Sequence, residues 1–298
     1  MKFNRRTTLA GTGALIAGAC VPLQQDTSGR LTAKLRLIEV GSGGTLGVML
    51  LNTADGQTIG HNSGERFAMC STFKASLAAL ALDRAAKGAL DLDKVLYWRE
   101  SDLQSYAPFA KERLVTGATI RELARAAQVL SDNTAANLVL GAVGGPSALT
   151  QFWRSLGDDV SRLDNVEPLL NVVLPGRVEN TTTPVAMART LAKILFRGGV
   201  APQAAQTLQQ WMRETQTGTK KVRAGLPAEW VAGDKTGFSG SPPGMQGVSA
   251  DIGFAIPVDD APIVFATYHR ATTVGPPSPM ADAAMAQVGG IIRQFTGV

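Results

Sequence analysis

The sequence predicts an α+β fold in which one lobe is an antiparallel sheet flanked by the terminal helices and a second lobe is helical. Three observations favour this fold class. Strand-like segments occur near the two ends of the chain, helical patterns fill the middle, and one helical pattern lies outside the strands at each end. The simplest assembly puts the N- and C-terminal strands in one sheet. With 298 residues, 45% of them apolar, the chain can bury a large core as one unit or two interleaved subdomains.

The first nineteen residues are expected to be an export signal. Lys2, Arg5 and Arg6 form a positive region, a mildly apolar run from Leu9 to Ala19 follows, and the run ends in a small-residue cleavage site. The run is too short to span a bilayer, and the paired arginines are similar to a twin-arginine signal. We therefore expect the mature chain, residues 20–298, to be periplasmic or secreted.

Charge and cysteine content exclude several kinds of protein. The formal net charge is +5, but without the three basic residues of the leader it is close to zero, so the mature chain has no electrostatic footprint for nucleic acid. Cys20 directly follows the cleavage site, as a lipid-attachment cysteine does, so soluble and lipid-anchored forms both stay open. Cys70 then has no disulfide partner. His61, His269 and the cysteines show no zinc spacing, and no metal is expected.

The first expected elements are a helix and a β-hairpin. Apolar residues recur at helical spacing from Leu31 to Glu39, and Gly41 ends the pattern. Two strand-like segments follow, Thr45–Leu51 and Gln57–His61. The Asp55-Gly56 pair between them favours a tight turn, so the two strands should be antiparallel neighbours.

The middle of the chain contains helical patterns with recognisable ends. Thr119 and Glu122 fit a capping box, and Pro146 and Pro184 suit the first turn of a helix. The segment 157–183 has no clear period, and so long a connection in a compact domain is usually functional. The expected helices lie at about 72–86, 119–130, 133–140, 146–156, 184–196 and 203–213.

The last part of the chain returns to strands. The expected strands are Trp230–Ala232, Val248–Ile256 and Ile263–Tyr268, and Met280–Phe295 should be a closing helix. The expected lobes are an α/β lobe at about 28–65 and 215–298 and a helical lobe at about 66–214.

The strongest chemical pattern is Ser71-x-x-Lys74 at the start of the helix 72–86. Positions three apart share one helix face, so Lys74 would lie beside Ser71. The helix N-terminus favours developing negative charge, and a partly desolvated amine can take the proton of a serine. Taken alone, a serine before a helix is more often a capping residue.

Three further motifs follow at the positions where helices and strands end. Ser131-Asp132-Asn133 lies in a break between helices, Glu167 and Asn171 lie in the long connection, and Lys235-Thr236-Gly237 ends a strand. Taken alone, the first motif is more simply a polar turn that caps a helix, the second is solvated loop residues, and the third is a strand end followed by a turn. Their combination and order, however, are typical of penicillin-reactive serine enzymes.

On these motifs the chain resembles the class A serine β-lactamases, over residues 28–296. The resemblance implies a β-lactamase/transpeptidase-like fold of two lobes with the site between them, and a small-molecule β-lactam as substrate. It also covers the runs Arg162-Leu163-Asp164, Glu167-Pro168, Leu170-Asn171, Thr181-Thr182-Thr183-Pro184, Ala224-Gly225-Leu226-Pro227 and Gly233-Asp234.

The resemblance implies the residues of acylation. Ser71 would attack the lactam carbonyl, and either Lys74 or Glu167 through a water would take its proton; both alternatives stay open. The backbone N–H groups of Ser71 and Phe238 would form the oxyanion hole. Ser131 would pass a proton to the departing lactam nitrogen.

It also implies the residues that bind substrate. Asn133 would hold the side-chain amide of the substrate, and Tyr106 would be an aromatic gatekeeper. Lys235 and Thr236, with Gly237 completing the motif, would grip the substrate carboxylate.

Asn171 would place a water for Glu167, the general base of deacylation. This pair favours turnover over the alternatives, which are a penicillin-binding D,D-peptidase, a non-hydrolysing β-lactam receptor and a secreted esterase. No cofactor and no stable protein partner are expected, and the chain should be a monomer.

Departures from the family pattern predict particular properties. Asn165 and Asn180 stand where the family often has an ion pair across the neck of the long loop, so we expect a more mobile loop and better access for bulky cephalosporins. Ser239 stands near the position of a cysteine that could pair with Cys70, so that bridge is not expected. The arginine that many members use for the substrate carboxylate has no obvious counterpart. Lys221 is the first candidate for its role, and Arg270 is the second.

Overall fold

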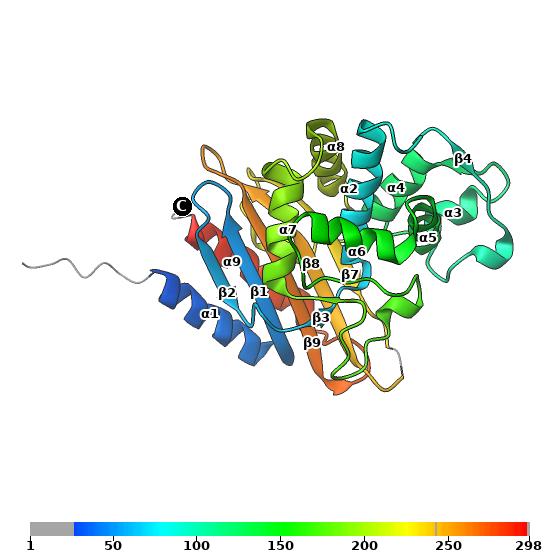
Figure 1. Ribbon diagram of the computed structural model, residues 1–298. Coiled ribbons are helices and arrows are strands. Elements are labelled where there is room, and N and C mark those ends of the chain that lie inside the picture. The colour runs from blue at the N-terminus through cyan, green and yellow to red at the C-terminus, as the bar shows by residue number, and fades with distance from the viewer. Residues whose placement is uncertain (1–26, 242, 297–298) are drawn as a thin grey trace, which may run out of the picture.

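The computed structural model describes residues 27–241 and 243–296 of the chain (Figure 1). Its centre is a five-stranded antiparallel sheet in the order β2-β1-β9-β8-β7, which confirms the predicted fold class. The hairpin of β1 and β2 pairs with the C-terminal strand β9, for example Val48 opposite Thr267. The strands are β1 Gly44–Asn52, β2 Thr58–His61, β7 Val231–Phe238, β8 Gln246–Ile256 and β9 Ile263–Val274.

The terminal helices cover one face of this sheet. They are α1, Thr27–Gly41, and α9, Ala281–Phe295. Leu31 and Leu35 of α1 are buried with Val288 of α9 and with Val48 of β1 in one hydrophobic cluster. The apolar residues of α1 recur every three or four positions, as required for one buried face.

The other face is covered by the helical lobe, which lies to the upper right of the sheet in Figure 1. Its longest buried stretch is in α2, where every residue from Phe73 to Asp83 is buried. A helix that is buried on all sides is a core element, and α2 can therefore hold its side chains in fixed positions. The helices are α2 Phe73–Ala86, α3 Pro108–Glu112, α4 Ile120–Val129, α5 Asn133–Ala142, α6 Gly145–Ser155, α7 Pro184–Phe196 and α8 Pro202–Arg213.

Local chemistry explains where the helices around the site begin. The predicted capping box is present at α4, where the Thr119 side chain accepts from Glu122 N and the Glu122 side chain accepts from Thr119 N. Asp132 caps α5, since its Oδ1 accepts from Ala135 N at 2.8 Å. Both caps satisfy N–H groups that have no partner within their helix.

The sequence prediction was incomplete at β7. The predicted strand Trp230–Ala232 was too short, because β7 runs from Val231 to Phe238 and pairs with β8. The Lys235-Thr236-Gly237 motif lies at the end of this strand, as predicted. Glycines normally weaken a strand, and for this reason the strand pattern in the sequence ended at Ala232. At Gly237 the missing side chain is a requirement, because a Cβ there would approach Met69 O to 3.0 Å. Short elements were also missed: α3 and the two-residue strands β3 Phe67–Ala68, β4 Val95–Leu96, β5 Ala118–Thr119 and β6 Thr181–Thr182.

The expected export signal and Cys20 lie outside the described residues. Among the residues that are described, no helix has the length and apolar character needed to cross a bilayer.

Candidate active site

Ser71 lies in a 3₁₀ turn, Cys70–Thr72, that leads directly into α2. Lys74 is in the first turn of α2, and its Nζ lies 2.9 Å from Ser71 Oγ, as the spacing predicted. Cys70 is buried and free, with a positive φ of 46°. The turn therefore presents the serine hydroxyl to an amine that comes from the core.

The Lys74 ammonium is completely buried among polar groups. Its Nζ donates to Ser131 O at 3.0 Å and to Asn133 Oδ1 at 2.5 Å, and it forms an ion pair with Glu167 Oε1 at 3.1 Å. Burial lowers the pKa of Lys74, while the charge of Glu167 acts in the opposite direction. A lysine whose pKa is lowered can exist as the neutral amine that accepts a proton.

Glu167 reaches the same centre from the long loop. Its side chain is buried, and Oε1 lies 3.4 Å from Ser71 Oγ. Asn171 Nδ2 donates to Glu167 Oε2 at 2.6 Å, so the two side chains are in direct contact. Asn137 of α5 holds the backbone of Glu167 from both sides, accepting from its N–H and donating to its carbonyl, each at 2.9 Å.

Asn137 was missed by the sequence analysis. The available signal was its spacing, because Asn137 is one helical turn after Asn133 and so faces the same side of α5. Asn133 contacts Lys74 while Asn137 contacts the backbone of Glu167. One face of α5 therefore positions both partners of Ser71.

Lys235 of β7 approaches from the other lobe. Its Nζ donates to Ser131 Oγ at 3.0 Å and to Thr236 O at 2.8 Å. Ser131 has a positive φ of 62°, unusual for a serine, in the break between α4 and α5. Burial, followed by the nearby charge of Lys74, lowers the pKa of Lys235 to about 7.

A buried polar clamp sets the position of Lys235, and this too was missed. Gln128 Nε2 of α4 donates to Asp234 O at 2.9 Å and to Thr215 Oγ1 at 3.0 Å. The Thr215 hydroxyl donates to the same carbonyl at 2.8 Å. Gln128 precedes Ser131 by three residues, so the clamp joins the chain segment of Ser131 to the strand of Lys235.

The backbone N–H of Phe238 faces the outer edge of the sheet. Ser239 N donates to Val248 O, toward β8. Successive N–H groups along a strand point in opposite directions, and β7 is an edge strand. The Phe238 N–H is therefore turned away from β8, and the 3₁₀ turn of Ser71 packs against β7 and β8.

These groups open into a cavity of about 420 Å³. Two exposed aromatic side chains, Tyr106 (51%) and Phe238 (62%), are part of its wall. Its wall includes residues of the turn before α2, of the α4–α5 break and of β7, which the sequence could not place together directly. The lining residues are Ser71, Tyr106, Ser131, Asn133, Thr217, Lys221, Thr236, Gly237, Phe238 and Asp282.

The two candidate cations for the substrate carboxylate are placed differently. Lys221 lines this cavity; its Nζ donates to Ser249 Oγ at 2.6 Å and forms an ion pair with Asp282. Arg270 does not line it and instead forms an ion pair with Glu65 in a separate cavity. The structure therefore does not support the second candidate, because Arg270 lines a different cavity from the one that contains Ser71.

Comparisons with known proteins agree with this geometry. A family profile described as the beta-lactamase enzyme family matches residues 30–296. Beta-lactamase OXY-2 of Klebsiella oxytoca is 43% identical over 235 residues, which are 79% of this chain and 79% of that relative. Beta-lactamase CTX-M-97 of Escherichia coli is 40% identical over 262 residues, with 88% and 87% covered.

A solved ancestral (GNCA) class A β-lactamase has a TM-score of 0.84 and 45% identity, and the match covers 89% of this chain and 99% of that structure. The likeness thus extends over nearly the whole described chain in both sequence and fold. The chain belongs to the class A serine β-lactamases and is an enzyme that hydrolyses β-lactam antibiotics.

Proposed function

We propose that Ser71, Lys74 and Glu167 carry the two half-reactions of this enzyme. The observation that supports this most strongly is their mutual contact, since Lys74 Nζ lies within 3.1 Å of both Ser71 Oγ and Glu167 Oε1. Ser71 Oγ bonds to the lactam carbonyl carbon, and its proton passes to Lys74 or, through a water, to Glu167. The carbonyl oxygen becomes an oxyanion that the backbone N–H groups of Ser71 and Phe238 stabilise.

Collapse of this intermediate breaks the lactam C–N bond. Ser131 gives its proton to the leaving nitrogen and is reprotonated from the neighbouring ammonium groups, whose positions are supported by the Lys235 Nζ to Ser131 Oγ distance of 3.0 Å. Lys235 and Thr236 hold the substrate carboxylate during these steps. The product of this half-reaction is an ester on Ser71.

Deacylation uses the other side of the same site. A water held by Asn171 and Glu167 attacks the ester carbonyl, Glu167 takes the water proton, and Ser71 leaves with a proton to regenerate the enzyme. The 2.6 Å contact between Asn171 Nδ2 and Glu167 Oε2 supports this pairing. The ion pair of 3.1 Å between Lys74 Nζ and Glu167 Oε1 keeps this carboxylate beside the ester.

Rapid mixing of purified residues 21–298 with a chromogenic cephalosporin tests these roles. We expect steady turnover, and mass spectrometry of a quenched reaction should locate the adduct on the peptide that contains Ser71. A stoichiometric burst without turnover, or an adduct on another residue, would contradict the proposed roles.

Lys221 is proposed to attract the substrate carboxylate. Replacing Lys221 by methionine should raise KM for penicillins about tenfold with little change in kcat, because a charge-assisted contact is lost. The exposed neighbour Lys220 provides the control, and Lys220→Met should have the parental KM. Equal KM values for the two variants would exclude Lys221 from substrate binding.

The ionisation of Lys235 is expected to limit activity at alkaline pH. Its pKa is about 7, so above that pH a growing fraction of the enzyme molecules carries a neutral Lys235 amine. A neutral amine attracts the substrate carboxylate only weakly. We therefore expect kcat/KM, which reports the free enzyme, to fall as pH rises above about 7. In Lys235→Arg the guanidinium stays protonated, so this decline should disappear. The same decline in both enzymes would assign it to another group.

The neck of the long loop is held by amide hydrogen bonds. Asn180 Nδ2 donates to Asn165 Oδ1 at 2.9 Å, and Asn180 Oδ1 accepts from the backbone N–H groups of Asp164 and Asn165. Among the described residues no ion pair crosses this neck. We still expect faster hydrogen exchange across residues 162–180 than in the flanking helices α6 and α7. Equal protection would contradict the predicted mobility and the proposed access for bulky cephalosporins.

We further propose that the mature protein is a periplasmic or secreted monomer, released after residue 19 or anchored by a lipid on Cys20. The basic leader and its small-residue cleavage site support export. Cell fractionation of the parent and of Cys20→Ala, with mass spectrometry of the N-terminal peptide, separates the two forms.

A further inference from the structure

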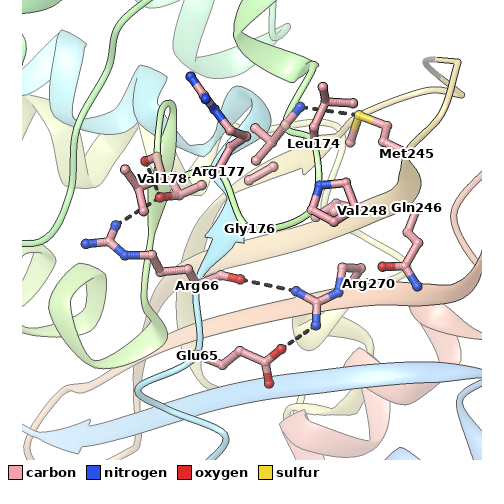
Figure 2. Close-up of a pocket in the computed structure, with 14 residues that line it drawn as sticks. Glu65, Arg66, Leu174, Gly176, Arg177, Val178, Met245, Gln246, Val248 and Arg270 are labelled. Carbon is pink, nitrogen blue, oxygen red and sulfur yellow. Dashed lines mark hydrogen bonds and ion pairs between the residues drawn. The ribbon is translucent and has the colours of Figure 1, made fainter.

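A second cavity, of about 370 Å³, lies behind the long loop (Figure 2). It is formed by the exit arm of the loop, residues 173–178, by Met245 just before β8 and Val248 within it, and by Arg66 and Arg270. None of its lining residues lines the cavity that contains Ser71. It is nearly as large as the substrate cavity, so a small organic molecule fits.

The lining of this cavity combines apolar side chains with three arginines, Arg66, Arg177 and Arg270. Figure 2 shows Met245 to the right and the guanidinium groups of Arg66 and Arg177 to the left. Most of the remaining wall is apolar and includes Ala68, Val173, Leu174, Pro175 and Val178.

The positive charge of the lining is not fully balanced. Arg270 forms an ion pair with Glu65, and Arg177 forms one with Glu179. Arg66 is half-buried and has no carboxylate within ion-pair distance among the described residues. Its Nη1 donates only to neutral oxygens, at 3.2 Å to Val160 O and 2.9 Å to Thr181 Oγ1. A partly desolvated cation without a counter-ion favours an anion from outside.

We propose that this cavity binds a small organic anion with an apolar body. The acidic group lies on the side of Arg66, and the body lies against Met245 and Val248. A sulfonate or carboxylate matches the planar guanidinium, which can donate two parallel hydrogen bonds. A neutral molecule of the same shape would gain only the apolar contacts.

The cavity is joined to the catalytic loop by direct contacts. Val173, two residues after Asn171, donates its N–H to Met245 Sδ at 3.4 Å. Val173 also packs on a buried cluster of Ala68, Cys70 and Val248, and Cys70 precedes Ser71. A bound molecule would therefore shift the conformation of residues 173–178, the part of the loop that follows Asn171. This coupling, unlike the binding itself, rests on the proposed role of Glu167 in deacylation.

Binding is tested with the fluorescent anion 8-anilinonaphthalene-1-sulfonate and its uncharged analogue N-phenyl-1-naphthylamine. Two proteins are titrated, the parent and Glu167→Ala. Glu167→Ala is first acylated by a penicillin, and mass spectrometry verifies the adduct, so that its substrate cavity is blocked. We expect saturable binding of the anion to both, much weaker binding of the neutral analogue, and NMR shifts at the amides of Ala68, Met245 and Val248. Loss of binding when Ser71 is acylated, or equal affinity for both probes, would overturn the proposal.

Two matched pairs of variants locate the anion. Arg66→Gln should weaken its affinity about tenfold, or about 1.4 kcal/mol, whereas Arg189→Gln, at an exposed arginine of α7, should not. Because Arg66 also contacts Thr181, a second pair leaves those hydrogen bonds intact. Val178→Glu places a negative charge at the cavity and should abolish binding, whereas Val178→Gln should retain it. Equal affinities within both pairs would overturn the site.

The coupling is measured separately in single-turnover kinetics of the parent. Saturating probe should change the deacylation rate by about fivefold or more and leave acylation nearly unchanged, within the usual size of allosteric coupling. Binding without this change would keep the site and refute only the coupling. If Glu167→Ala accumulates no acyl-enzyme, the proposed function is refuted. The NMR data on the parent protein then still decide whether the anion binds in this cavity.

Discussion

Replacing Glu167 by alanine is expected to stop the reaction at the acyl-enzyme. Ser71 keeps its contact with Lys74, at 2.9 Å, so acylation can proceed. The water that Asn171 would still hold has then lost the carboxylate that takes its proton. Deacylation should fall by about 10²–10⁴-fold, the usual contribution of a general base. Stopped-flow absorbance should show a burst of one equivalent, and intact-protein mass spectrometry should show the stalled adduct.

Two controls separate this role from effects on folding. Glu167→Gln keeps the shape and the contact with Asn171 but cannot accept a proton, so it should stall in the same way. Glu122→Ala removes an exposed glutamate that caps α4 and should leave turnover at the parental rate, with a small loss of stability. Continued turnover in Glu167→Ala would exclude Glu167 as the deacylation base.

Replacing Lys74 by alanine is expected to slow acylation by about 10²–10⁴-fold. Lys74 is the buried cation that contacts Ser71, Asn133 and Glu167 together, and its removal leaves Glu167 buried without its ionic partner. The acylation rate is read from the burst phase at several substrate concentrations, with thermal unfolding as the check on the fold.

The two open choices for the acylation base are separated by Lys74→Arg. A guanidinium keeps the positive charge beside Glu167 but does not give up its proton near neutral pH. If Lys74 is the base, Lys74→Arg should acylate as slowly as Lys74→Ala. Near-parental acylation in Lys74→Arg would instead assign the proton transfer to Glu167 through a water.

Much of the architecture could be predicted from local patterns. The helical spacing of Leu31 and Leu35 located α1, and the Asp55-Gly56 turn located the hairpin of β1 and β2. The capping box at Thr119 located the start of α4. These features involve residues close in sequence, so their geometry follows from helical and strand periods.

The site residues could be identified for a different reason. Ser71 and Lys74 are one helical turn apart, and Glu167 and Asn171 are four residues apart, so each pair is joined by short-range geometry. Which pairs meet was known only from the resemblance to a family. The structure supplies the distances that join the pairs, such as 3.1 Å between Lys74 and Glu167.

Other features depended entirely on the tertiary structure. No local pattern distinguishes Lys221, which faces the substrate cavity, from Arg270, which faces away from it. The grip of Asn137 on Glu167 and of Gln128 on Asp234 spans 30 and 106 residues of sequence. The cavity behind the loop is formed by four separate segments.

The amino-acid sequence by itself determined the elements, the class of chemistry and the residues able to perform it. Only the packing of the two lobes decided which cation lines the substrate cavity, what holds the side chains around Ser71 in place and where a second cavity forms. The physical reason is that side-chain type and helical or strand period act over a few residues. Contacts across the sheet and between lobes depend on how distant segments bury their apolar faces together.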